Sequence, residues 1–240
     1  MMRKSFVLSA VLLMAALAYA SSPTDLAVQA ALSKDLAKYP SVSAKVEDRV
    51  ATLAGSVTRF TDKQKLERKA KSYGAVTRVV NLITVDGPQV ADEELAHKLG
   101  RSLAYDRSSQ GNIFNWFDVE VENGKVILTG NARTPWDKES ALSLVAATKG
   151  VRDLVDRVEV LPLSSMDDEI RVLAARRIYG STNRLNALDP AHPIRIIVKN
   201  GNVTLKGVVN SQVEKSLAGM RVNGILGVFS VDNKLEVSRS

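Results

Sequence analysis

Cysteine is absent from this chain of 240 residues, and histidine occurs only twice, at His97 and His192. The lack of cysteine excludes disulfide bonds, thiolate zinc sites, iron–sulfur clusters, cysteine nucleophiles and a lipid-modified N-terminal cysteine. The two histidines lie far apart, and neither forms an H-x-x-x-H pair that would place two imidazoles on one helical face. We therefore predict that the protein has no metal site.

The sequence signatures of common enzyme sites are missing as well. The chain contains no G-x-G-x-x-G or Walker pattern for phosphates and no G-x-S-x-G elbow for a serine nucleophile. Acidic clusters at residues 92–94 and 167–169 fit the N-termini of helices, where negative charge is favourable, better than a catalytic pair. The protein is predicted not to be an enzyme, with no catalytic residue and no cofactor.

One uncharged hydrophobic run stands out, residues 6–20, directly after Arg3 and Lys4. It is shorter than the roughly 20 residues that a membrane-spanning helix needs. Ala18 and Ala20 form the A-x-A pattern that precedes a signal-peptidase site. We predict that residues 1–20 are a signal peptide cleaved after Ala20 and that the protein is periplasmic, with an uncleaved N-terminal anchor as the alternative. No later run is long enough to span a bilayer, so a peripheral protein is expected.

Three glycines that end Leu-x-Gly steps, Gly55, Gly130 and Gly207, reveal an internal repeat with spacings of 75 and 77 residues. A second pattern, the apolar alternation that includes Ile83, recurs with the same spacings at Val158 and Leu235. Self-similarity at a fixed period indicates tandem units. The predicted domains are residues 21–87, 88–162 and 163–240.

Each copy has the same order of local signals. A helical stretch opened by an acidic residue (25–38, 92–104 and 167–179) precedes a hairpin of alternating strands, a second helix and a third strand. The predicted fold class is α+β: three αββαβ units, each a mixed three-stranded sheet with both helices on one face.

The hairpin turns differ between the copies. Asn123-Gly124 and Asn200-Gly201 are typical of type I′ turns, because both residues tolerate positive φ angles. The first copy has Asp48-Arg49 there, which predicts a looser turn or another type. The repeated glycines predict either a positive φ or the close approach of a helix.

Two segments carry a resemblance to a known family. Residues 121–130 read VENGKVILTG, and residues 227–237 read GVFSVDNKLEV. This combination, three times over in a chain with an export signal, resembles tandem BON domains and is similar to the osmotically inducible periplasmic proteins built from them. The first copy departs from the pattern at Arg49 and the second at Asp156. The resemblance implies a non-enzymatic phospholipid binder that protects the cell envelope, and the lack of cysteine does not fit the lipoprotein branch.

The charge distribution agrees with an anionic lipid surface. Residues 21–88 and 164–240 each carry 11 basic and 7 acidic side chains, whereas residues 89–163 carry 9 and 12. Each Lys or Arg near an anionic bilayer contributes roughly 1 kcal/mol. The residues that we predict to contact lipid are Phe114, Trp116, Arg171, Arg176, Arg177 and Tyr179.

These candidates have alternative interpretations. Phe114 and Trp116 have no counterparts in the other copies, and tryptophan favours membrane interfaces, but both could cover the core beneath their own loop. The arginines flank an apolar helix face as in a helix that snorkels at a bilayer, which any docked helix also shows. The alternative functions are a periplasmic chaperone or protein-interaction module and, third, a glycan or peptidoglycan binder. Nucleic acid is not an expected partner, because export separates the protein from it.

Overall fold

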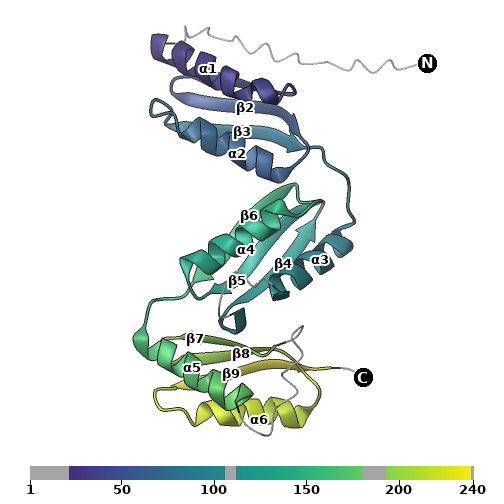
Figure 1. The fold of residues 1–240 in the computed structure, drawn as a ribbon, viewed down its shortest axis with the longest axis vertical. Helices are drawn as coiled ribbons and strands as arrows, with labels where there is room; N and C mark the ends of the chain where they lie inside the picture. Colours follow the sequence, from purple (N-terminus) through teal and green to yellow (C-terminus); the bar gives the residue numbers. More distant parts are fainter. Residues whose placement is uncertain (1–21, 106–111, 181–192, 239–240) are drawn as a thin grey trace, which may run out of the picture. The chain divides into compact units, whose positions relative to one another are not determined.

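The computed structural model describes residues 22–105, 112–180 and 193–238 (Figure 1). The predicted signal peptide and His192 lie outside these residues. The chain divides into two compact units. One holds most of the first repeat, and the other holds Gly55–Lys65 together with the described residues from Ile83 onward, so that it includes both the second and the third repeat.

The order of α-helices and strands is the same in all three repeats, and the first two also contain a short 3-10 helix. The first repeat contains α1 (Pro23–Asp35), the short 3-10 helix η1 (Leu36–Lys38), β1 (Val42–Glu47), β2 (Val50–Val57), α2 (Phe60–Lys71) and β3 (Arg78–Val85). The second contains α3 (Asp92–Tyr105), η2 (Asn112–Phe114), β4 (Trp116–Glu122), β5 (Lys125–Ala132), α4 (Pro135–Ala147) and β6 (Asp153–Val160). The third contains α5 (Ser165–Tyr179), β7 (Arg195–Lys199), β8 (Asn202–Val209), α6 (Gln212–Asn223) and β9 (Ser230–Val237).

Each repeat forms its own three-stranded sheet, with its second strand in the centre. β5 pairs antiparallel with β4 and parallel with β6, and β8 pairs in the same way with β7 and β9. The antiparallel pair is joined by a two-residue turn, whereas the parallel pair needs a helical crossover. The predicted α+β fold of three αββαβ units with mixed sheets is confirmed.

The core of the third repeat shows how the helices cover one sheet face. Alternate residues of β7 and β8, such as Ile196, Val198 and Leu205, are fully buried against Ile178 of α5 and Val222 of α6. Because side chains alternate across a strand, this pattern places both helices on the same face of the sheet. The opposite face is left for polar residues and for contacts with neighbouring segments.

The first hairpin turn corrects one expectation. Asp48 and Arg49 have φ angles of 48° and 62°, so this turn has both residues in the left-handed region, like Asn123-Gly124 and Asn200-Gly201. The expectation of a looser or different turn was wrong. The backbone N–H of Arg49 donates to the carboxylate of Asp25 at 3.2 Å, and its Nε donates to the carbonyl of Ala75. These bonds offset the cost of the left-handed conformation for residues with a Cβ atom.

An aspartate near the start of the first helix holds this turn in all three repeats. Asp92 accepts hydrogen bonds from the backbone N–H groups of Asn123 and Gly124, at 2.6 and 2.9 Å. In the third repeat Asp167 accepts hydrogen bonds from the N–H groups of Asn200 and Gly201. In the first repeat Asp25 accepts one from the N–H of Arg49. The favourable position of these acids at a helix N-terminus does not by itself predict this contact.

The repeated glycines have the positive φ angles that were one of the two expectations: 120° at Gly55, 130° at Gly130 and 126° at Gly207. The close neighbour is a strand and not a helix. A Cβ atom on Gly130 would lie 2.0 Å from the backbone oxygen of Trp116 in the adjacent strand β4. The glycine is therefore required both for its backbone angle and for its contact with the neighbouring strand.

Candidate functional site

The two aromatic residues predicted to contact lipid lie where the second repeat meets the third, inside the second compact unit. Phe114, in η2, packs against the core of the third repeat, and the guanidinium of Arg133 lies 5.7 Å from the centre of its ring. The ammonium of Lys206 in β8 lies 4.7 Å from the centre of the Trp116 ring. Both aromatic rings are half-buried. Phe114 thus covers part of the neighbouring repeat, and Trp116 contacts it through Lys206.

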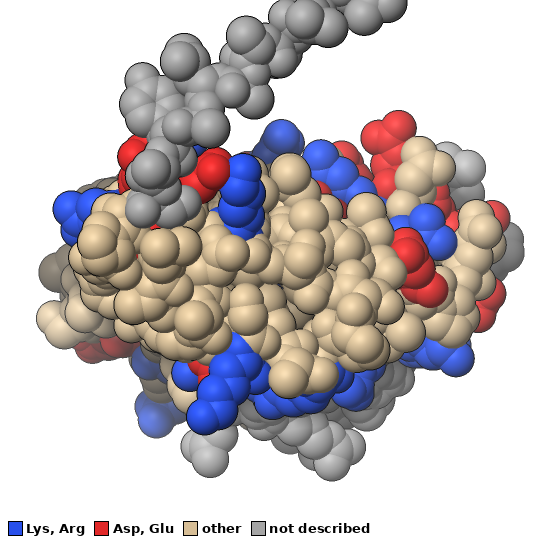
Figure 2. All heavy atoms as spheres, turned by 90° about the horizontal axis from the view of Figure 1, so that it is seen from above, with Lys and Arg blue, Asp and Glu red and all other residues tan. Residues whose placement is uncertain are grey.

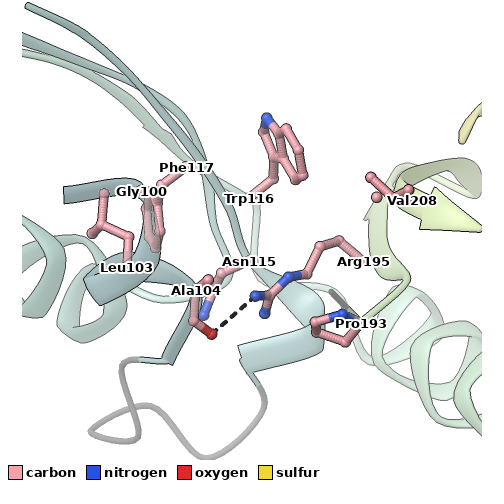
Figure 3. Close-up of a pocket in the computed structure, with 10 residues that line it drawn as sticks. Gly100, Leu103, Ala104, Asn115, Trp116, Phe117, Pro193, Arg195 and Val208 are labelled. Carbon is pink, nitrogen blue, oxygen red and sulfur yellow. Dashed lines mark hydrogen bonds between the residues drawn. The ribbon is translucent and has the colours of Figure 1, made fainter. Parts of the chain in front are cut away.

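A cavity of about 190 Å³ lies beside Trp116 (Figure 3). Its walls combine the end of α3 and the start of β4 with residues of the third repeat, among them Arg195 and Val208. Arg195 is only 6% exposed, and its Nη2 donates to the carbonyl of Ala104 at 3.1 Å, as the dashed line in Figure 3 shows. Burial lowers the pKa of the Arg195 guanidinium and of the Lys206 ammonium.

The contacts around this cavity fasten the two repeats together. Arg133 forms an ion pair with Asp168 at 3.1 Å, and Lys199 forms one with Glu159 at 2.5 Å. The described residues that line the cavity include no carboxylate, hydroxyl or imidazole group, so they offer no nucleophile and no general base. We interpret the cavity as part of a structural junction.

Arg171 does not lie at the surface, which corrects its place among the lipid-contacting candidates. It is 2% exposed, forms an ion pair with Asp168 at 2.7 Å and donates from Nη2 to the carbonyl of Val198 at 2.6 Å. Its Nε is buried with no hydrogen-bond partner among the described residues. The helical spacing placed Arg171 at the edge of the apolar face, but its side chain points inward to the end of β7.

Tyr179 is also engaged within the fold. Its hydroxyl donates to the carbonyl of Ile194 at 2.5 Å, and burial raises the pKa of the hydroxyl far above its ordinary value. The ring belongs to the side chains that pack against the core of the third repeat. Tyr179 therefore stabilises the start of β7, and little of its surface is left for a ligand.

Arg176 and Arg177 are exposed on α5. Nη1 of Arg177 donates to the carbonyl of Arg221 in α6 at 3.1 Å, and Nη1 of Arg221 donates to the carbonyl of Arg177 at 3.3 Å. This reciprocal pair brings a third arginine beside the two that the sequence singled out. We call Arg176, Arg177 and Arg221 the basic cluster.

The third repeat carries a group of exposed apolar side chains that was not predicted from the sequence. They are Leu163, Met166, Leu226 and Phe229, which we call the apolar tip, and they are 91%, 58%, 95% and 77% exposed. A signal was present in the repeat itself. Where the third copy has Phe229, the other copies have Arg152 and Thr77.

The first repeat presents a different surface. Figure 2 shows a broad area of uncharged side chains with charged side chains of both signs around its edges. Leu26 of α1 is 57% exposed. On α2, two lysines form ion pairs, Lys69 with Asp35 at 3.1 Å and Lys71 with Glu67 at 2.6 Å.

Neither a metal-binding cluster nor a membrane-spanning helix occurs among the described residues. No group of three or more His, Cys, Asp or Glu side chains is arranged to hold a metal ion among the described residues. No helix within residues 22–105, 112–180 and 193–238 is long and apolar enough to cross a membrane.

Comparison with known proteins gives a family match in each repeat. The model of the BON domain matches residues 23–87, 91–162 and 175–239. A curated protein from Actinobacillus pleuropneumoniae, named 21 kDa hemolysin, is 26% identical over 175 residues, which cover 70% of this chain and 86% of that protein.

A solved structure of CdsD, a structural protein of the type III secretion system of Chlamydia trachomatis, matches with 15% identity and a TM-score of 0.25, covering 87% of this chain and 91% of that one. The C-terminal domain of CdsD matches with 16% identity and a TM-score of 0.24, covering 87% and 96%. At these scores the likeness supports no conclusion about fold or function.

Proposed function

The chain belongs to the BON-domain family, and from this premise we propose that it is a non-enzymatic, exported protein of the cell envelope that binds anionic phospholipid surfaces peripherally. In this proposal residues 1–20 direct export and are removed after Ala20, and the protein acts in the periplasm during envelope stress. Membrane and phospholipid binding is the activity that the family resemblance implies.

The observation that carries the proposal is the basic cluster of the third repeat. Arg176 and Arg177 are exposed, and Arg221 lies beside Arg177 through the reciprocal bonds between α5 and α6. Guanidinium groups bind phosphate oxygens through two parallel N–H donors, which suits a lipid headgroup. The name of the curated relative, a hemolysin, describes a protein that lyses blood cells, and it supports an action at membranes.

Sedimentation with vesicles tests this function directly. Protein purified after export is mixed with neutral phosphatidylcholine vesicles or with vesicles that also contain phosphatidylglycerol, at low and at high salt. We expect binding to the anionic vesicles and weaker binding as salt rises, because salt screens exposed charges over about 8 Å at physiological strength. No binding to either vesicle at low salt would refute the proposed function.

A matched pair of variants tests the cluster. The double variant Arg176→Gln/Arg177→Gln should lose roughly 2 kcal/mol of binding free energy, at about 1 kcal/mol for each arginine, or about 30-fold in affinity. The control is Lys65→Gln/Arg68→Gln, which removes the same charge from exposed positions of α2. Equal losses in both variants would show that net charge, and not this cluster, governs binding.

A further inference from the structure

The apolar tip gathers at one end of the third repeat. Met166 opens α5, and a Cβ atom on Gly227 would lie 3.9 Å from its Cγ. The ring of Phe229 lies on the hairpin turn, since a Cβ atom on Gly201 would come within 2.6 Å of its Cδ2. Leu226 directly precedes Gly227, and Leu163 precedes α5 by two residues. Four large apolar side chains therefore project from adjoining loops and a helix start.

The fold itself does not require these side chains. The second repeat has the same elements with Lys149 in place of Leu226 and Arg152 in place of Phe229, and the first repeat has Gly74 and Thr77 there. At the position of Met166 the other copies have Ala91 and Thr24. Exposed apolar side chains that are grouped, rather than scattered singly, mark an interaction surface.

Four backbone N–H groups behind the tip donate hydrogen bonds within the protein. The N–H of Phe229 donates to the carbonyl of Gly201 at 2.9 Å, and the N–H of Val228 donates to that of Ile225 at 3.2 Å. The N–H groups of the hairpin turn both donate to Asp167 at 2.8 Å. Polar backbone groups with internal partners can leave water at low cost, which is the main requirement for entry into a bilayer.

The basic cluster lies alongside the tip. A Cβ atom on Gly224 would lie 3.1 Å from Nη1 of Arg177, and Leu226 follows two residues later in the same loop. Apolar side chains next to arginines form the pattern of proteins that bind in the interfacial plane of a membrane, with the arginines at the headgroups.

We propose that the apolar tip inserts into the interface of an anionic phospholipid bilayer while the basic cluster binds its headgroups. This inference rests on the proposed function and names the site and the mode of binding. A second copy or a folded partner fits less well, because a stable protein interface uses roughly 20–30 residues on each side, far more than this tip offers. Insertion adds an apolar contribution that salt does not screen.

A matched set of variants tests the inserted side chains. The triple variant Met166→Ser/Leu226→Ser/Phe229→Ser should weaken binding to phosphatidylglycerol vesicles by roughly tenfold or more, because it removes the partial burial of three apolar side chains. It should also remove the binding that persists at high salt. The control, Leu82→Ser/Trp136→Ser/Val213→Ser, changes side chains that are 60%, 68% and 66% exposed elsewhere. It should bind as the unchanged protein does.

A second measurement reports position rather than affinity. Because the chain contains no cysteine, Leu226→Cys can be labelled at one site with an environment-sensitive fluorophore, with Val213→Cys as the control. On anionic vesicles the emission of the label at residue 226 should shift to the blue and become protected from an aqueous quencher, while the label at residue 213 should not change.

The outcomes separate the inference from the proposed function. If the unchanged protein binds no vesicles, both fail. If it binds but the triple variant binds equally well and the label at residue 226 stays in water, only the insertion fails and the electrostatic binding remains. A blue shift that needs no vesicles, but appears with rising protein concentration or with an unfolded client protein, would assign the tip to a protein partner and overturn the insertion.

Discussion

Asp167 offers the sharpest test of how the hairpin of the third repeat is held. It is 1% exposed, and its two carboxylate oxygens accept hydrogen bonds from the backbone N–H groups of Asn200 and Gly201, both at 2.8 Å. Asp167→Ala leaves both donors without this partner, and the N–H of Gly201 is buried. Asp167→Asn keeps one oxygen and loses the other acceptor together with the charge.

The magnitude follows from these two bonds. A hydrogen bond to a charged group contributes about 1.5–3 kcal/mol, and a buried donor left without a partner costs about 1–3 kcal/mol. We therefore expect Asp167→Ala to lower the free energy of unfolding of the third repeat by about 3 kcal/mol or more, and Asp167→Asn by about half of that. Such a loss is a large fraction of the 5–15 kcal/mol that is typical of a whole domain.

Hydrogen exchange is the assay of choice, because it reports on the affected amides even in a chain of several domains. A loss of about 3 kcal/mol corresponds to exchange about 100-fold faster at the amides of Asn200 and Gly201. Glu169→Gln, a charge-removing change at an exposed neighbouring position, is the control and should alter stability by less than about 0.5 kcal/mol. If the two amides of Asp167→Asn are protected from exchange as in the unchanged protein, Asp167 does not stabilise this turn.

Three further predictions concern the other two repeats. Gly130→Ala should destabilise the second repeat strongly in thermal unfolding, because residue 130 has a φ of 130° and its added Cβ would lie 2.0 Å from a backbone oxygen. The control is Gly100→Ala in α3, where an added Cβ would meet no atom within 4 Å. It should stabilise the repeat by about 0.5–1 kcal/mol. The hydroxyl of Tyr73 is the largest cause that lowers the pKa of the Asp35 carboxyl below its ordinary value of 3.8, and Lys69 also lowers it. Tyr73→Phe should therefore cost stability at neutral pH. In urea unfolding, this difference in stability should vanish as the pH falls through the lowered pKa. Trp116→Ala should weaken the contact between the second and third repeats by about 0.5–1 kcal/mol, which faster hydrogen exchange in β8 would report. Its binding to vesicles should stay within about twofold of that of the unchanged protein. A large loss of vesicle binding would instead place Trp116 in the membrane-binding site.

Features that depend on backbone geometry alone could be predicted from the sequence. The Asn-Gly dipeptides and the repeated glycines were interpretable because few residues adopt a positive φ. Arg49 shows the limit of that reasoning. Its positive φ is held by Asp25, 24 positions earlier, and no property of the dipeptide itself reports that contact.

The roles of side chains could not be predicted where the decisive neighbour belongs to another element or another repeat. The helical spacing of Arg171 predicted a position at the border of the apolar face, but the carbonyl of Val198 and the carboxylate of Asp168 hold the side chain in a buried position. Phe114 and Trp116 lack counterparts in the other copies. Their function in the structure is contact with the third repeat, and that contact is set by tertiary packing.

The division of charge between the repeats bears on which one approaches a membrane. On β4 of the second repeat, Asp118, Glu120 and Glu122 are exposed in a row on the face opposite to the core, and an anionic surface would repel them. The third repeat carries the basic cluster and, next to it, the apolar tip. An anionic bilayer attracts both the first and the third repeat through charge at distances up to about the screening length, and the apolar tip distinguishes the third repeat at contact. This order predicts an association rate that falls with salt and a dissociation rate that rises when the tip is removed, and stopped-flow measurements on vesicles can resolve the two.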